Sequence, residues 1–242
     1  GWELAIDYRH TFKNGLHFGV TASVADDKTE VTKWTYNTKI PSYGATGWWD
    51  KSAYKEGMVL GDIWGLQFDR FLTEDDFNAD GSLKAGLPDQ TKVFPAGYQF
   101  APGDVLYKDL DNNGEIVKQT NTNDKGDLSV IGNALPRLQF GLNLDAAWKG
   151  FDISMFFQGV AKRKLWAAGN QVLPGFTTGE PFYKGAEDYW TPENTDAFYP
   201  RPMDYKQSAS GNYSVNDRYL LNMAYLLSLI HISEPTRLAL IS

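Results

Sequence analysis

Residues 2 to 24 alternate between apolar and polar side chains on both sides of one tight turn. The apolar positions are Trp2, Leu4, Ile6, Tyr8 and Phe12 before the turn, and Leu16, Phe18, Val20, Ala22 and Val24 after it. A period of two places alternate side chains on opposite faces of a strand. Asn14-Gly15 tolerates the positive φ that a tight turn demands, so the sequence predicts a β-hairpin with one apolar and one polar face.

The same alternation returns from Leu138 to Phe157, around a second turn at Lys149-Gly150. Phe156 is the exception to the pattern. The segments from about 35 to 135 and from 165 to 216 are loop-like and rich in Gly, Pro, Asp and Asn. We therefore expect an all-β protein in which tight turns alternate with very long loops.

Two architectures place such faces differently. In a soluble β-sandwich the apolar faces pack together, whereas in a membrane β-barrel they meet lipid. The eleven residues from Trp2 to Phe12 would span about 35 Å, or roughly 25 Å when tilted by about 45°, which is the height of the lipid-facing band of a barrel. Aromatic rings at the strand ends would lie at the water–lipid boundary. The pattern favours the barrel and leaves a secreted, glycan-binding β-sandwich as the alternative.

Composition excludes several classes of function. The formal charge of −7 argues against a nucleic-acid partner, and the absence of Cys excludes disulfides, thiol catalysis and Cys-based zinc sites. No apolar run reaches the roughly 18 to 20 residues of a spanning helix. The acids at 74 to 76 lack an implied facing carboxylate, and neither a nucleophile–base pair nor a phosphate loop is evident. We therefore predict that the chain is not an enzyme.

Five segments occur in an order that resembles one family. They are "YKEGMVLGDIWGLQFDRFLTEDDF" (54–77), "PGDVLYKDLDNNGEI" (102–116), "IGNALPRLQFGLNLDAAWKGFDISMFFQGV" (131–160), "YWTPENTDAFYPRP" (189–202) and "DRYLLNMAYL" (217–226). Together they resemble the C-terminal part of the SusC/RagA family of TonB-dependent outer-membrane transporters of Bacteroidetes-type bacteria. The resemblance covers most of residues 1–226.

The resemblance implies part of a transmembrane antiparallel β-barrel, usually of 22 strands, in the cell outer membrane. Such a transporter has an N-terminal plug, is covered by a SusD-like lipoprotein and imports oligosaccharides or peptides with energy from the TonB complex. This chain carries neither the plug nor the TonB box, so we expect residues 1–226 to be a piece of the barrel wall with its outer loops. One face of each strand would meet outer-membrane lipid, and the other the lumen or the plug.

"DLDNNGEI" suggests a calcium site. Asp109, Asp111 and Asn113 stand at alternate positions before Gly114, as in the first half of a calcium loop. However, the twelfth position is Thr120 rather than a bidentate Glu, which leaves Asp124 and Asp127 as possible substitutes. An Asx-rich turn without metal explains the same residues, so Ca²⁺ is the only candidate cofactor and the metal-free turn is the favoured interpretation.

Three tryptophans in the expected outer loops are candidates for substrate binding. Trp48, Trp49 and Trp166 could stack on sugars or grip peptides. Each ring could equally pack its own loop or contact the lid protein, and for any one ring packing is favoured.

The end of the chain departs from the resemblance after Leu226. The stretch from 227 to 237, "LSLIHISEPTR", resembles the translation of a transposase-adapter sequence used in preparing DNA libraries, and 238 to 242 would be read-through. We expect residues 227–242 to be a non-native tail without function.

Overall fold

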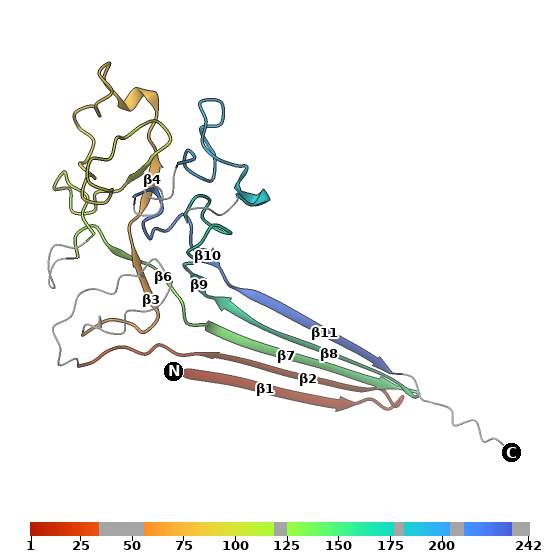
Figure 1. The fold of residues 1–242 in the computed structure, drawn as a ribbon. Coiled ribbons are helices and arrows are strands. Elements are labelled where there is room, and N and C mark those ends of the chain that lie inside the picture. Colours follow the sequence, from red (N-terminus) through yellow and green to blue (C-terminus); the bar gives the residue numbers. More distant parts are fainter. Residues whose placement is uncertain (34–55, 119–124, 177–181, 204–210, 234–242) are drawn as a thin grey trace. The chain divides into compact units, whose positions relative to one another are not determined.

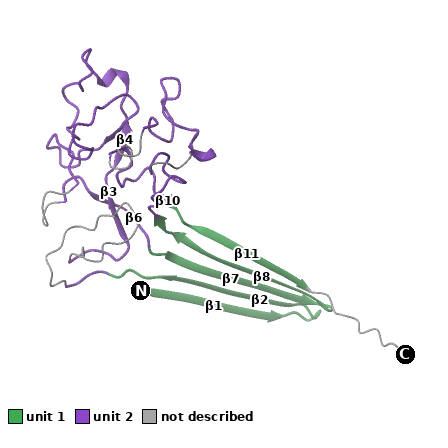
Figure 2. Cartoon of the chain, viewed as in Figure 1, with its two compact units in different colours: residues 1–29, 135–164, 222–242 green, residues 30–134, 165–221 purple. Residues whose placement is uncertain are grey.

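A computed structural model of the chain describes residues 1–33, 56–118, 125–176, 182–203 and 211–233. Within these ranges the regular structure is strand, apart from two short 3₁₀ turns. No helix in the described ranges is long and apolar enough to cross a membrane. The chain divides into unit 1 (1–29, 135–164 and 222–242) and unit 2 (30–134 and 165–221), shown in Figure 2.

Unit 1 is built on one antiparallel sheet of five long strands. The strands are β1 (Trp2–Thr11), β2 (His17–Asp26), β7 (Arg137–Trp148), β8 (Phe151–Lys162) and β11 (Tyr225–Ser233). Their order across the sheet is β1-β2-β7-β8-β11 (Figure 1). The expected all-β, antiparallel architecture is confirmed, whereas the five strands form an open sheet and closure into a barrel is not seen.

Both predicted hairpins are present. In the first, the N–H of Gly15 donates to the carbonyl of Phe12 at 2.9 Å, and Gly15 has φ 83°. In the second, Lys149 and Gly150 have φ 51° and 88°, the two positive values that a type I′ turn requires. Turn chemistry that is readable in the sequence thus fixes the register of each hairpin.

The register places like side chains on the same face across the sheet. Leu4 pairs with Val24, which pairs with Phe140, on the apolar face. One row of the polar face consists of Asp7, Thr21, Asn143, Phe156 and Leu229. Phe156, the exception in the sequence pattern, therefore meets an equally exceptional Leu229 on the neighbouring strand.

Strand β11 begins before the expected tail and continues into it. Its residues pair in unbroken antiparallel register with β8, from Tyr225 opposite Val160 to Ser233 opposite Asp152. The expectation that residues 227–242 are non-native, and with it the proposed boundary at 226, stays a prediction.

Unit 2 holds short strands connected by long ordered loops. Its strands and turns are β3 (Asp62–Gly65), β4 (Phe68–Phe71), the 3₁₀ turn η1 (Glu74–Asp76), β5 (Val105–Tyr107), β6 (Ser129–Asn133) and the 3₁₀ turn η2 (Lys184–Ala186). β3 pairs with β6 and β4 with β5, both antiparallel. Two further short strands, β9 (Lys164–Leu165) and β10 (Leu221–Asn222), pair with each other.

Two apolar clusters form the core of unit 2. The first gathers Leu66, Phe71, Val105, Tyr107, Ile116 and Trp190, among others, and the second gathers Trp166, Leu173, Tyr213 and Tyr219. Buried side-chain amides form hydrogen bonds with backbone groups of the unit 2 loops. Gln90 donates to the carbonyl of Val105 at 2.7 Å, and Asn212 accepts from the N–H of Val105 at 2.8 Å. Side chains thus supply the hydrogen bonds that a larger sheet would provide.

Candidate functional site

The apolar face of the unit 1 sheet is open at its two outer strands, β1 and β11, and half-buried over the inner strands. Ile6 is 56% exposed, and Trp2, Leu4, Tyr8 and Leu226 are similarly open. Both buried apolar clusters consist of unit 2 residues, so they include none of these side chains. An isolated sheet with one bare apolar face is marginal in water, because exposed apolar patches of this extent promote association. A face of this kind is suited to an apolar environment.

Aromatic side chains gather at the end of the sheet that carries the two tight turns. The rings of His10 and Phe12 meet edge to face with centroids 4.6 Å apart, and Tyr8 stacks on His10 at 6.4 Å. The indole N–H of Trp148 donates to the carbonyl of Asn14 at 3.3 Å, and the Lys149 ammonium lies 4.5 Å from the centroid of the Trp148 ring. Rings with one apolar side and one polar contact suit a water–lipid boundary.

The opposite face carries polar side chains that bond across strands. The Thr21 hydroxyl donates to Asp7 at 2.6 Å, and the Arg9 Nε lies 3.4 Å from Asp7 in an exposed ion pair. The carboxylate of Asp145 covers Gly19 so closely that a Cβ at position 19 would lie 1.9 Å from Oδ2. The polar face expected from the sequence is present, and its position on the lumen side stays a prediction.

The predicted calcium loop brings three acids together. Side-chain oxygens of Asp109, Asp111 and Asp127 lie within 4.8 Å of one another. Asp127 is fully buried and comes from a segment that the sequence offered as a substitute source of ligands. Asn113 lies in the same turn, where it donates to Asp111 at 3.0 Å.

Local hydrogen bonds occupy most of these oxygens. Asp109 accepts from the N–H of Gly114 at 2.8 Å through Oδ2, and Asp127 accepts from the N–H groups of Leu110 and Val117, both at 2.8 Å. Among the oxygens of these three carboxylates, Oδ1 of Asp109 is the one that is buried and has no hydrogen-bond partner in the described part of the chain. The oxygen-only donor set and this single open oxygen fit a hard cation such as Ca²⁺, while the other bonds are those of a self-contained Asx turn. Calcium binding stays a prediction.

Of the three tryptophan candidates for substrate binding, the structure describes Trp166 alone. Trp166 is 2% exposed and packs with Leu173, Tyr213 and Tyr219 in the second core cluster. Trp48 and Trp49 lie outside the described residues. Substrate binding by these three rings remains a prediction, and the structure describes a packing role for Trp166.

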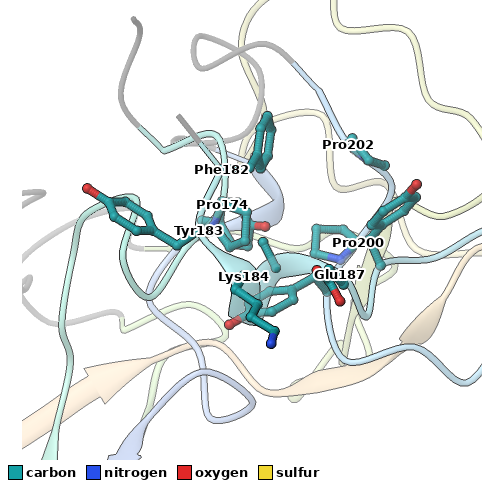
Figure 3. A pocket seen from close by; sticks show the side chains of 11 residues that line it. Pro174, Phe182, Tyr183, Lys184, Glu187, Pro200 and Pro202 are labelled. Carbon is teal, nitrogen blue, oxygen red and sulfur yellow. The ribbon is translucent and has the colours of Figure 1, made fainter. Parts of the chain in front are cut away.

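A cleft in unit 2 was not anticipated from the sequence (Figure 3). It has a volume of about 440 Å³ and is named here the Tyr–Pro cleft after its lining. Prolines 174, 200 and 202 line it together with the rings of Phe182, Tyr183, Tyr189, Tyr199 and Tyr213. Its charged residues are Lys184, which begins the η2 turn, and Glu187, which follows the turn directly. Its parts are scattered from 174 to 213 without periodicity, so only the local richness in Tyr and Pro could have pointed to it.

No protein-family model matches the chain. TonB-dependent receptor P3 of Formosa agariphila is 23% identical over 229 residues, which cover 91% of this chain and 20% of the receptor. TonB-dependent receptor P26 of the same organism is 36% identical over 95 residues, which cover 38% of this chain and 9% of the receptor. The chain thus spans about one fifth of the length of the first of these curated relatives.

A solved structure of the RagAB peptide transporter resembles the chain with a TM-score of 0.57 and 13% identity, over 93% of this chain and 21% of that chain. At this identity the likeness is one of fold. The resemblance inferred from the five segments is confirmed, since the chain is similar in sequence to TonB-dependent receptors and similar in fold to part of the RagAB transporter. Both kinds of relative are receptors or transporters rather than enzymes.

Proposed function

We propose that the chain forms part of the wall and outer loops of a TonB-dependent importer in the outer membrane. The importer would take up oligosaccharides or peptides together with a SusD-like lipoprotein, and TonB would act through a region outside this chain. The observation that carries the proposal is the bare apolar face of the five-stranded sheet, which lipid would cover. The relatives named TonB-dependent receptor and the RagAB transporter support it.

The dimensions of the strands agree with a membrane band. β7 and β8 have 12 residues each, or about 40 Å at ~3.3 Å per residue, which exceeds the length of most soluble strands. A tilt of about 45° reduces this length to the height of the lipid-facing band of a barrel. Aromatic rings at the turn end would then lie at one boundary of the band.

Two alternatives fit these observations less well. A soluble β-sandwich needs a second layer over the apolar face, and the described residues of unit 1 form no second long-stranded sheet. A glycoside hydrolase needs two facing carboxylates, whereas the described lining of the Tyr–Pro cleft includes one, that of Glu187.

Orientation follows from the lengths of the connections. We place the turns at Asn14-Gly15 and Lys149-Gly150 in the periplasm and the segments 35–135 and 165–216 outside the cell, because short turns suit the inner rim of such barrels.

Epitope tags in the full-length receptor test both insertion and orientation. A tag at Gly81, a position in an open turn, should bind antibody on intact cells, whereas a tag at Asn14 should bind only after the outer membrane is opened. The reverse labelling would overturn the topology. Recovery of both tagged proteins in a soluble fraction would refute the membrane assignment.

A further inference from the structure

We propose that the Tyr–Pro cleft binds an extended peptide whose proline or aromatic side chains enter it. The inference rests on the proposed function and narrows its substrate class from oligosaccharides or peptides to peptides. The occupant is a free peptide arriving from outside the cell.

The size and concavity of the cleft favour a free ligand over a docked protein. Its volume of about 440 Å³ lies within the range of roughly 300 to 1,000 Å³ that is typical of small-ligand sites. A protein partner such as a lid usually covers a much broader surface, on the order of 800 Å² on each side. A short peptide segment with one or two rings fits a hollow of this size.

The chemistry of the lining favours a peptide over a sugar. A sugar presents hydroxyl groups on every side and needs many hydrogen-bonding partners, because unpaired buried polar groups are costly. Three prolines, Ala186 and Phe182 offer no side-chain hydrogen bond, and the polar groups of the lining are limited to four tyrosine hydroxyls and the charges of Lys184 and Glu187. Grooves lined by aromatic rings are instead the common receptors for proline-rich, extended peptides, which lose little conformational entropy on binding.

Two unpaired charges would orient such a peptide. Neither Lys184 nor Glu187 forms an ion pair with another residue that the structure describes. The two lie three positions apart, at the start of the η2 turn and directly after it, so a ligand with both a cationic and an anionic group could pair with both. A peptide carries such groups at its termini and in its side chains. Glu187 would hold an arginine or amine of the ligand through a charge-assisted hydrogen bond.

The wall of the cleft is preorganised. Tyr199 stacks on Tyr219 with centroids 6.0 Å apart and meets Phe198 edge to face at 4.9 Å. The N–H of Tyr199 donates to the carbonyl of Asp188 at 2.9 Å, and its carbonyl accepts from Trp190 at 3.0 Å. Rings fixed in this way need no ordering when a ligand binds, which lowers the entropic cost of binding. Phe182, 59% exposed, is the ring most open to solvent.

The test measures binding to the full-length receptor in detergent by fluorescence anisotropy. The probes are a labelled proline-rich hexapeptide with one arginine, the same peptide with glutamine in place of arginine, and a labelled neutral glucan hexasaccharide. Phe182→Ala should lower the affinity of the receptor for both peptides about tenfold. Glu187→Gln should lower the affinity for the arginine peptide by about three- to tenfold and leave the affinity for the glutamine peptide unchanged. Glu193→Gln, an exposed acid outside the cleft lining, is the matched control and should change neither.

Three results would overturn the inference. The first is peptide affinity that neither Phe182→Ala nor Glu187→Gln changes. The second is a hexasaccharide that binds more tightly than the peptides and whose binding Phe182→Ala weakens. The third is a Phe182→Ala receptor that no longer docks the lipoprotein but binds peptide as well as before. The tags at positions 81 and 14 report separately on the importer. A receptor that inserts with the expected topology yet fails to bind peptide refutes the peptide site alone.

Discussion

The fully buried carboxylate of Asp104 accepts hydrogen bonds from Arg201, 97 residues further along the chain, at 2.8 Å from Nε and 3.2 Å from Nη2. Tyr98 and Asn212 donate to the same oxygen, Oδ1, at 2.8 and 3.0 Å. Burial and the nearby Asp104 charge raise the pKa of Tyr98 above its usual range, so it remains a neutral donor. This network fastens distant loops of unit 2 to one another.

Removing the cation of this network should be costly. We expect Arg201→Met to lower the local free energy of unfolding by about 3 kcal/mol, because it leaves a buried charge without its counter-ion. Hydrogen exchange at the Val105 amide, which donates to Asn212, measures this in the full-length receptor. Lys92→Met is the control: its ion pair with Glu115 is exposed and should contribute less than about 1 kcal/mol. Equal costs for the two variants would contradict the prediction.

The ion pair between Arg70 and Asp76 should make the stability of unit 2 depend on pH in the acidic range. Two hydrogen bonds from the Arg70 guanidinium, at 2.6 and 2.7 Å, hold the pKa of Asp76 at about 2, below its ordinary 3.8. A depressed pKa adds stability that is present above pH 3.8 and is lost as the pH falls through about 2.

We expect a loss of about 1 to 2 kcal/mol between pH 5 and 2 from this carboxylate, a figure reduced for solvent around the half-exposed Arg70. Melting temperatures of the detergent-solubilised receptor across this range measure it. Asp76→Asn should remove that part of the pH dependence, and an unchanged profile would show that Asp76 does not contribute.

We expect calcium to bind the loop weakly. The three converging acids and the open oxygen of Asp109 favour a cation, whereas the Asx-turn hydrogen bonds and the missing twelfth-position Glu limit its affinity. We expect a Kd no tighter than about 10⁻⁴ to 10⁻³ M. Calorimetry should give a smaller calcium heat for Asp111→Ala than for wild type, with Asp80→Ala, an exposed Asx turn elsewhere, as control. Equal heats in all three proteins would end the proposal.

The encoding nucleotides decide the status of residues 227–242. In β11, Leu226, Ile230 and Ile232 fall on the apolar face, but Leu227 and Leu229 fall on the polar face and Ser228 on the apolar one. This supports the proposal that the stretch is a translated adapter rather than a native strand. We expect the nucleotides for "LSLIHISEPTR" to match a transposase adapter. An unrelated nucleotide sequence there would restore β11 as a natural strand.

Periodicity and turn chemistry made unit 1 readable from the sequence. Alternation assigned each side chain to a face, and the positive φ values at Gly15 and Gly150 are those that an Asn-Gly or Lys-Gly turn demands. The described loops of unit 2 show no comparable periodicity in their sequence. The main features of unit 2 come from loops that are distant in the sequence but meet in the folded chain. These features are the contact of Asp104 with Arg201, the burial of Trp166 and the Tyr–Pro cleft, and composition alone does not predict where they form.

Substitutions at two adjacent residues of β7 can test whether each face of the sheet meets lipid or water. Leu142 lies on the apolar face and pairs with Ala22 and Phe157, whereas Asn143 lies on the polar face and pairs with Thr21 and Phe156. Leu142→Arg should lower the stability of the full-length receptor by about 2 to 4 kcal/mol if that face lies near the bilayer midplane, because a guanidinium is costly in hydrocarbon.

Asn143→Arg introduces the same charge at the same depth and should cost much less, since the polar face meets water or other polar groups. Denaturant unfolding of the two variants in lipid vesicles gives the comparison. A near-zero cost for Leu142→Arg would mean that the apolar face is not in lipid, and equal large costs would mean that the two faces are not distinguished. A large cost confined to Leu142→Arg would tie the sequence alternation directly to the orientation of the sheet in the membrane.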